Sequence, residues 1–372
     1  MGEDYTEIGR RAWVHMEGRD IPYPFQNNIR GLQPQTVYEC LRGLIEAQRR
    51  DHDPGDFQEW VLGVFGEGIA HHFMFPYNQK VWATPPSAMS FDWIAERVSV
   101  VDVDQILRNV LLGENQANWG PNATFRYPLH GGTGTLYERM AAPLEPYLRR
   151  SHPVVAIDPV TRRVTTAGGR RWRYDVLLST MPLDDLVAIV DGAPAAVRRA
   201  AADLLSSGTH VVGVGIDRDD DSDRTWVYFP EADVPFYRVT YLSHYSPHVT
   251  PRPDQTLLLT ETGTSPRRPQ DAATIEARVV AGLRTVGMLR DDDRILAVWR
   301  CSPDKTYPVP SLGRDAALAV IQPWLNSLGI AARGRFGAWL YEIGNMDHSF
   351  MQGYQWADRI LDGSPETVWI PR

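Results

Sequence analysis

Apolar residues recur at three- and four-residue spacing from Pro34 to about Asn118, as at Val37, Leu41, Leu44 and Ile45, and this periodicity predicts a mostly helical stretch. Further helices are expected at 193–205, 271–288 and 314–328, and a last one near His348. Short apolar runs bounded by turn residues predict strands at 154–157, 163–166 and 175–179, followed by β-rich runs at 209–216, 225–229, 236–242 and 256–262. Residues 119–136 are loop-like, with a helix expected after Gly134.

These elements alternate without a steady βαβ rhythm, so the expected fold class is α+β, or mixed α/β. We expect residues 1–33 and 119–310 to form a sheet-containing core, and residues 34–118 a mostly helical lobe. Residues 311–372 are expected to complete the core as a C-terminal helical and strand segment. Residues 1–30 read as a short extended segment that ends in the turn-rich stretch at 22–25.

Composition excludes several classes of protein. The 372 residues carry a net charge of −8, which disfavours binding to nucleic acid or to acidic membranes. Two cysteines, Cys40 and Cys301, are too few for a disulfide scaffold or a cysteine zinc cluster. No window approaches the roughly 18 apolar residues of a membrane span, and the acidic start is unlike a signal peptide. The expectation is a cytoplasmic, enzyme-sized protein.

No G-x-G-x-x-G turn follows an N-terminal strand, so the fingerprint of a dinucleotide-binding fold is missing. The cluster at 131–134, Gly-Gly-Thr-Gly, could cradle a phosphate at a helix start or could form a plain turn.

Three segments combine aromatic rings, amides and arginines: residues 23–28, residues 76–97, and residues 226–230 followed by 236–238. Each ring alone is explained by core packing. Together they indicate a nucleotide-sugar pocket, because rings stack on a base and arginines bind a diphosphate.

The same residues carry a resemblance to a known family. The stretches 22–29 (Pro-Tyr-Pro-Phe-Gln-Asn-Asn-Ile), 73–83, 118–126, 235–238, 245–247 and 334–351 resemble UDP-galactopyranose mutases of the eukaryotic type. That family interconverts six- and five-membered sugar rings on a nucleotide diphosphate, and its members bind a flavin. The resemblance spans the chain from about residue 12 onward.

The resemblance implies a role for each matching residue. Tyr23, Phe25 and Gln26 would hold the nucleobase, with Asn78 and Trp82 in the substrate cleft. Arg97 and Arg238 would clamp the diphosphate, and Asn122 would reach the nucleotide or its sugar. The hydroxyl groups of Tyr228, Tyr307 and Tyr341 would also bind phosphate. Among these, Arg97, Arg238, Tyr307 and Tyr341 are the expected catalytic residues.

The flavin site matches the family only in part. Arg335, Asn345 and Ser349 match the flavin-facing motif, whereas Met346 replaces an amide and the phosphate-binding turn is missing. The expected fold is therefore a remnant of a dinucleotide-binding domain without its N-terminal βαβ unit, and tight FAD binding is not expected. Either the chain is a fragment, or it resembles the flavin-independent GDP-hexose pyranose–furanose mutases of nucleoside-antibiotic biosynthesis, which the resemblance implies use a divalent metal.

Mg²⁺ or Mn²⁺ prefers carboxylates and phosphate oxygens. Asp347 and His348, in the flavin-facing segment, are the first candidate ligands. His71, His72, His244 and Asp304 come second, and the acidic runs 217–223 and 291–293 read as solvated loops.

The expected function is interconversion of NDP-hexopyranose and NDP-hexofuranose, of the GDP- or UDP-galactose type. Two alternatives remain: an FAD-dependent mutase whose flavin unit is on another chain, and a non-catalytic nucleotide-sugar binding protein. The sequence does not choose between UDP and GDP, and it leaves a homo-oligomer open.

Overall fold

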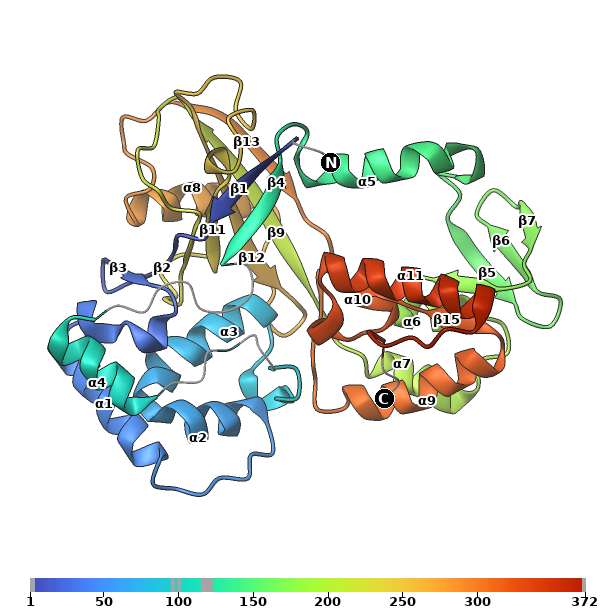
Figure 1. The fold of residues 1–372 in the computed structure, drawn as a ribbon, viewed down its shortest axis with the longest axis horizontal. Helices are drawn as coiled ribbons and strands as arrows, with labels where there is room; N and C mark the ends of the chain where they lie inside the picture. Colours follow the sequence, from blue (N-terminus) through green and yellow to red (C-terminus); the bar gives the residue numbers. More distant parts are fainter. Residues whose placement is uncertain (1–3, 95–97, 99–101, 115–122, 370–372) are drawn as a thin grey trace. The chain divides into compact units, whose positions relative to one another are not determined.

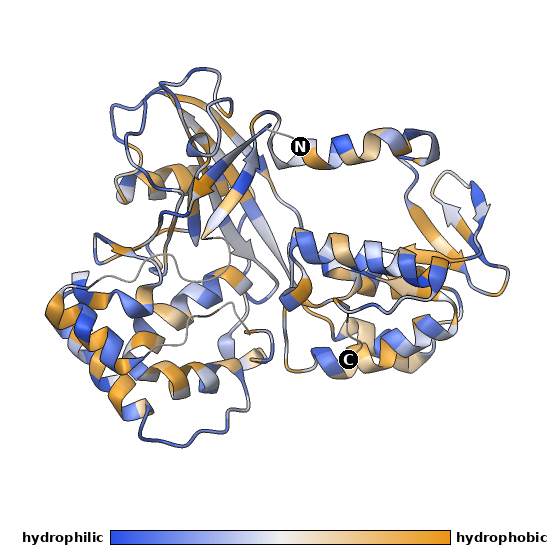
Figure 2. Cartoon of the chain, viewed as in Figure 1, coloured by the Kyte–Doolittle hydropathy of each residue, from blue (hydrophilic) through white to orange (hydrophobic). Residues whose placement is uncertain are grey.

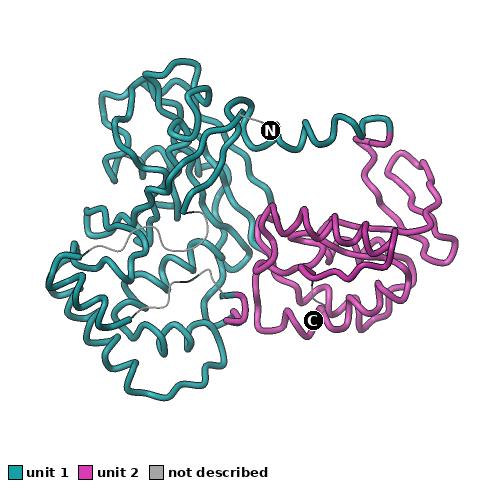
Figure 3. The backbone as a smooth tube through the Cα atoms, in the orientation of Figure 1, with its two compact units in different colours: residues 1–88, 94–146, 207–304 teal, residues 89–93, 147–206, 305–372 magenta. Residues whose placement is uncertain are grey.

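The computed structural model describes residues 4–94, 98, 102–114 and 123–369. The chain divides into two compact units, shown in different colours in Figure 3. Unit 1 comprises Met1–Ala88, Ile94–Pro146 and Ser207–Asp304, and unit 2 comprises Met89–Trp93, Tyr147–Ser206 and Lys305–Arg372. The mixed α/β class is confirmed. The units do not follow the expected boundaries, because residues 147–206 group with the C-terminal segment.

Unit 1 is built on a strongly hydrogen-bonded sheet with strand order β13-β9-β12-β11-β10-β2-β3 (Figure 1). Its strands are β13 (Ile295–Cys301), β9 (Ser206–Ile216), β12 (Thr256–Thr264), β11 (Arg238–Tyr241), β10 (Trp226–Tyr228), β2 (Ala12–Met16) and β3 (Arg19–Pro22). Neighbours are antiparallel except for the parallel pair β10 and β2. A separate antiparallel pair joins β1 (Tyr5–Gly9) to β4 (Thr124–Pro128).

One face of this sheet packs on α8 (Ile275–Thr285). Val212 and Val214 of β9 and Val279 and Leu283 of α8 are fully buried in the resulting core. Because side chains alternate along a strand, the residues at odd positions of β9 point to the opposite face of the sheet.

The helical lobe of unit 1 contains α1 (Pro34–Ala47), α2 (Phe57–Ile69), a π-helical turn (Ala70–Met74), α3 (Phe75–Trp82) and α4 (Val103–Leu112). Pro34 starts α1, and the Asp56 side chain caps α2 by accepting a hydrogen bond from the Glu59 backbone N–H. Figure 2 shows many hydrophobic residues along α1 and α2. The two helices meet at glycines: a Cβ on Gly66, where φ is +71°, would lie 2.0 Å from the Gly43 carbonyl oxygen. The remaining α-helix of unit 1 among the described residues is α5 (Gly132–Ala141).

Unit 2 contains an antiparallel sheet, a short parallel pair and a group of helices. The sheet consists of β5 (Val154–Asp158), β6 (Arg163–Thr166) and β7 (Arg171–Arg173), and the parallel pair is β8 (Leu177–Ser179) with β15 (Ile330–Ala332). The other elements are α6 (Leu183–Ile189), α7 (Ala195–Ala202), β14 (Tyr307–Pro308), α9 (Arg314–Ser327), α10 (Gly334–Gly337) and α11 (Met346–Asp362). Leu186, Ile321 and Trp339 are fully buried in the core of this unit.

Most predicted elements are confirmed to within a few residues. The predicted helix at 314–328 is α9, and the strand predicted at 163–166 is β6. The expected loop 119–136 differs, since it contains β4 and since α5 begins at Gly132. In the described part of the chain, no helix has the length and apolar character needed to cross a bilayer.

Candidate substrate site

Three neighbouring strands of unit 1 place Tyr228, Arg238 and Glu261 in a row across the sheet. Tyr228 of β10 lies directly opposite Arg238 of β11, and Arg238 lies directly opposite Glu261 of β12. Residues directly opposite one another in antiparallel strands share a face of the sheet. The Arg238 Nη2 atom donates to Glu261 Oε1 at 2.5 Å. This row, Tyr228–Arg238–Glu261, is on the face opposite the α8 core, because Glu261 pairs with Val211, an odd position of β9.

A stack of aromatic rings meets the Tyr228 end of this row. The Tyr228 ring lies 5.3 Å from the ring of Tyr23 and 5.4 Å from that of Tyr77. Tyr77 stacks on Phe73 at 5.2 Å, and Phe73 stacks on Phe25 at 4.5 Å. Burial raises the pKa of Tyr228, an effect that the nearby Arg238 charge opposes, so the phenol remains a hydrogen-bond donor near neutral pH.

Three other predicted substrate residues of unit 1 are on the same elements as these rings. Gln26 follows Phe25 in a 3₁₀ turn and is buried. Asn78 is buried in α3, where its Nδ2 donates to the Met74 carbonyl at 2.8 Å, and Trp82 ends the same helix and is 2% exposed. Arg97 and Asn122 lie outside the described residues. In unit 1, ring contacts and strand pairing connect Tyr23, Phe25, Tyr228 and Arg238, whereas Gln26, Asn78 and Trp82 are carried by the same 3₁₀ turn and helix as rings of the stack.

The predicted residues of unit 2 form a second group. The rings of Tyr307 and Tyr341 meet edge to face at 5.7 Å, and the Arg335 guanidinium lies 5.3 Å from the Tyr307 ring centre. Arg335 donates to the carbonyl oxygens of Gly344 and Thr306 at 2.8 and 3.3 Å. These contacts hold the guanidinium in place beside the two tyrosines.

The candidate metal ligands occur at the start of α11. Asn345 precedes this helix, and its carbonyl accepts from the Ser349 backbone N–H at 2.9 Å. Asp347 is exposed, and His348 Nδ1 is buried with no partner among the described residues. Among all the residues that the structure describes, no three His, Cys, Asp or Glu side chains are grouped so that they could hold a metal ion. Asp347 and His348 thus supply at most two protein ligands.

The secondary metal candidates have partners within the protein. His72 is hydrogen-bonded to Glu39 at 2.7 Å, His71 to the Glu67 carbonyl at 2.9 Å, and His244 to the Arg224 carbonyl at 2.6 Å. Asp304 is exposed.

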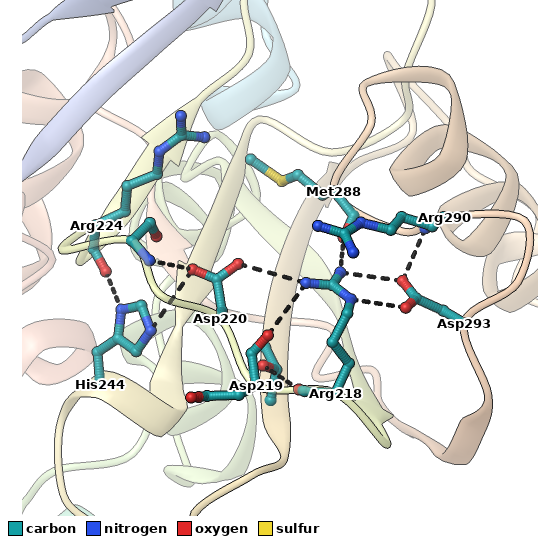
Figure 4. Close-up of polar contacts among 10 residues, drawn as sticks. Arg218, Asp219, Asp220, Arg224, His244, Met288, Arg290 and Asp293 are labelled. Atoms are coloured by element: carbon teal, nitrogen blue, oxygen red, sulfur yellow. Dashed lines mark hydrogen bonds and ion pairs between the residues drawn. The ribbon is translucent and has the colours of Figure 1, made fainter.

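The acidic runs 217–223 and 291–293 form ion pairs with arginines (Figure 4). Arg218 binds both oxygens of Asp293, at 2.7 and 3.0 Å, and lies 4.0 Å from Asp220, which is 3.8 Å from His244. Hydrogen bonds from Arg218 hold the pKa of Asp293 below its usual range despite burial. These carboxylates connect two loops of unit 1.

The residues present do not fit a complete FAD site. FAD needs a glycine turn between a parallel strand and a helix to hold its pyrophosphate. The glycine cluster at 131–134 instead follows β4, a strand of an antiparallel pair. The parallel pair β8 and β15 has no such glycine motif beside it, since the 372 residues contain no G-x-G-x-x-G.

Sequence reasoning did not single out Glu261 or Tyr77. The signal available for Glu261 was a carboxylate inside an otherwise apolar and threonine-rich strand, 256–262. A cavity of about 240 Å³ lies elsewhere in unit 1, between α1 and α2, and none of the predicted site residues lines it.

Comparison with known proteins places these observations in a family context. Residues 4–303 match the family of flavin-containing amine oxidoreductases. The fold is similar to a crystal structure of reduced UDP-galactopyranose mutase, with a TM-score of 0.95 and 37% identity over 98% of this chain and 80% of that one.

More distant structures share the fold alone. One is an Exiguobacterium sp. 255-15 protein whose assignment as a protoporphyrinogen oxidase is provisional, with a TM-score of 0.64, 16% identity, and coverage of 88% of this chain and 76% of that chain. Another is a fatty acid isomerase from P. acnes that produces CLA, with a TM-score of 0.58, 12% identity, and coverage of 92% and 78%.

Proposed function

Because the chain belongs to the family of flavin-containing amine oxidoreductases and is 37% identical to UDP-galactopyranose mutase over 98% of its length, we propose that it is a nucleotide-sugar mutase. Its substrate would be an NDP-hexose of the UDP- or GDP-galactose type, and its reaction the interconversion of the pyranose and furanose forms.

The observation that supports this proposal most is the row Tyr228–Arg238–Glu261 beneath the rings of Tyr23 and Tyr77. A guanidinium can bind two diphosphate oxygens at once, and tyrosine rings offer a stacking surface for a base. We assign Arg238 and Tyr228 to the diphosphate, and Tyr23 with Gln26 to the nucleobase. Arg97, Asn122, Tyr307 and Tyr341 keep the diphosphate and sugar roles that the resemblance implies.

The reaction changes which oxygen closes the ring. The bond between C1 and the diphosphate breaks, and the 4-hydroxyl oxygen attacks C1 to give a bicyclic sugar. The C1–O5 bond then breaks, the diphosphate returns to C1, and the proton lost from O4 is taken up by O5. Fixed positive charge on Arg238 stabilises the departing diphosphate in this scheme.

The 372 residues contain no G-x-G-x-x-G turn, and we propose that a divalent cation, Mg²⁺ or Mn²⁺, assists the reaction. Such an ion would supply Lewis-acid activation of the diphosphate. Mg²⁺ bound to substrate phosphates needs only one or two carboxylates from the protein. Asp347 would provide one carboxylate, and the His348 imidazole beside it is the second candidate ligand.

The test is product analysis by chromatography after incubation with UDP-galactose or GDP-galactose. We expect furanose product with Mg²⁺ or Mn²⁺, its loss in EDTA, and its recovery when the metal is restored. Arg238→Lys should reduce turnover at least tenfold, because lysine cannot form the bidentate contact. Full turnover in EDTA would refute the metal assignment, and binding without any furanose would refute the mutase and indicate a nucleotide-sugar binding protein.

A second candidate is a mutase that uses FAD whose phosphate-binding part lies on another polypeptide. An apolar stripe along α11 favours it: Met346, Phe350 and Tyr354, four residues apart, are each about half exposed. Absorption bands of flavin in the purified protein, near one flavin per chain, would support this candidate over the metal.

A further inference from the structure

The row Tyr228–Arg238–Glu261 contains one carboxylate that none of the assigned roles uses. Glu261 is on β12, next to the strand that carries Arg238, and its side chain is 14% exposed. Its Oε1 atom accepts the hydrogen bond from Arg238. Its Oε2 atom is buried and has no hydrogen-bond partner among the residues that the structure describes.

A buried carboxylate oxygen is costly unless a donor reaches it. The neighbouring strand adds a second polar atom to the same face of the sheet. Thr209 of β9, directly opposite Gly263, is diagonal to Glu261 and 2% exposed. Its hydroxyl also lacks a partner within the described part of the chain. The same face of the sheet therefore has a carboxylate oxygen of Glu261 directly opposite Arg238 and, diagonal to it on the next strand, the Thr209 hydroxyl.

We infer that Glu261 is a specificity-determining residue that recognises the hexose, with Oε2 accepting a hydrogen bond from a sugar hydroxyl. This inference rests on one part of the proposed function, the binding of a nucleotide sugar. The hexose is attached directly to the diphosphate, so an arginine that binds the diphosphate brings the sugar close to its own neighbours. Sugar hydroxyls can donate, and an ionised carboxylate can only accept.

In this proposal Arg238 binds both Glu261 and the diphosphate. A guanidinium has five N–H donors, and the ion pair with Glu261 uses one Nη2 hydrogen. A role limited to positioning Arg238 would weaken the binding of a free nucleotide and of a nucleotide sugar equally. A role in sugar recognition would weaken the nucleotide sugar more.

The test measures by isothermal titration calorimetry how tightly the protein binds a free nucleotide and the corresponding nucleotide sugar. One pair is UDP and UDP-galactose, and the other is GDP and GDP-galactose. Glu261→Ala should weaken binding of the nucleotide sugar by about tenfold to a hundredfold relative to the nucleotide, the range expected for a hydrogen bond to a charged group. Glu261→Gln keeps an acceptor oxygen of the same shape and should lose less. The matched control is Glu276→Gln on α8, which removes a carboxylate from a partly exposed ion pair with Arg300 of β13 and should change the binding of neither ligand.

Equal losses for the nucleotide and the nucleotide sugar, or no loss, would overturn the inference. Deoxygalactose analogues provide a second measurement. One analogue lacks the hydroxyl that Glu261 recognises, and Glu261→Ala and wild type should bind that analogue equally well. A ratio of variant to wild-type dissociation constants that is the same for all analogues would contradict the assignment.

Thermal melting identifies a variant that fails to fold, and Glu261→Gln then replaces Glu261→Ala. Binding needs no turnover, so a wild-type protein that binds UDP-galactose without making furanose refutes the proposed function and leaves this inference standing. A wild-type protein that binds neither ligand of either pair refutes both.

Discussion

Lys80, one of two lysines in the chain, is buried in α3 and gives the protein a testable pH-dependence of stability. Its side chain is 3% exposed, and its Nζ donates to the Glu231 carbonyl at 2.7 Å. Burial, with a smaller effect from the Arg268 charge, lowers the pKa of Lys80 from 10.5 to about 7. Lys80→Met keeps most of the apolar volume and removes the amine.

The direction in which stability changes with pH follows from the number of protons that Lys80 binds in the folded and unfolded states. Between pH 7 and 10.5 the unfolded chain holds a proton on Lys80 and the folded protein does not, so the stability rises with pH across this window. Below pH 7 Lys80 is protonated in both states, and the folded protein bears the full free-energy cost of burying its charge. The pKa difference corresponds to about 5 kcal/mol at 1.36 kcal/mol per pH unit. By linkage, the contribution of Lys80 should become more favourable by about 2.5 kcal/mol between pH 6.5 and pH 9.

The assay is urea denaturation of wild type and Lys80→Met at both pH values. The variant loses the donor to the Glu231 carbonyl, a cost of about 1–3 kcal/mol at either pH. The free energy of unfolding of Lys80→Met, relative to that of wild type, should therefore be about 2.5 kcal/mol lower at pH 9 than at pH 6.5. Lys305→Met is the control. Burial opposes the charge of Lys305, but hydrogen bonds to Asp184 and Asp185 outweigh burial and raise its pKa, so it stays charged in both states over this range. A difference between wild type and Lys80→Met that is constant with pH would refute the reasoning.

Two further predictions concern buried contacts. Glu366→Gln should destabilise the protein by about 3–5 kcal/mol in urea denaturation, because it leaves the buried Arg333 guanidinium, now bound at 2.6 and 2.8 Å, without its counter-charge. A loss below about 1 kcal/mol would contradict it. Gly66→Ala should lower the melting temperature or prevent folding, since the new Cβ would lie 2.0 Å from the Gly43 carbonyl oxygen at a φ of +71°. Gly134→Ala, with open space around its Cβ and a helical backbone, should be neutral or slightly stabilising.

The elements that the sequence predicted well are those whose hydrophobic pattern is set by one buried face. In α9, Leu318, Ile321 and Leu325 recur at helical spacing and are all buried, so the periodicity was sufficient to predict the helix at 314–328. In contrast, β13 (Ile295–Cys301) is an edge strand whose residues are mostly exposed. Its pairing with β9 is set by backbone hydrogen bonds, and these leave no alternation in the sequence.

Prediction of the candidate site was limited in the same way, because part of the site depends on how strands pair. Local motifs were sufficient to predict Tyr23, Tyr228 and Arg238 as candidate site residues, because rings and guanidinium groups are conspicuous in short segments. The partner of Arg238 was not predicted, because the row Tyr228–Arg238–Glu261 depends on the register of two strand pairs. A shift of one residue in either pair would turn the side chains of that strand to the other face of the sheet.

The boundaries of the two units were not predicted for a similar reason. Residues 147–206 and 305–372 are separated along the chain by the β9–β13 region, yet they share one core. Leu186 of α6 and Ile321 of α9 are both fully buried in it, and β8 pairs in parallel with β15 across more than 150 residues of sequence. Parallel pairing needs a long connection, and here that connection contains most of the sheet of unit 1. The candidate substrate residues on the sheet therefore lie in sequence between the two halves of unit 2, and neither composition nor local periodicity predicts such an insertion.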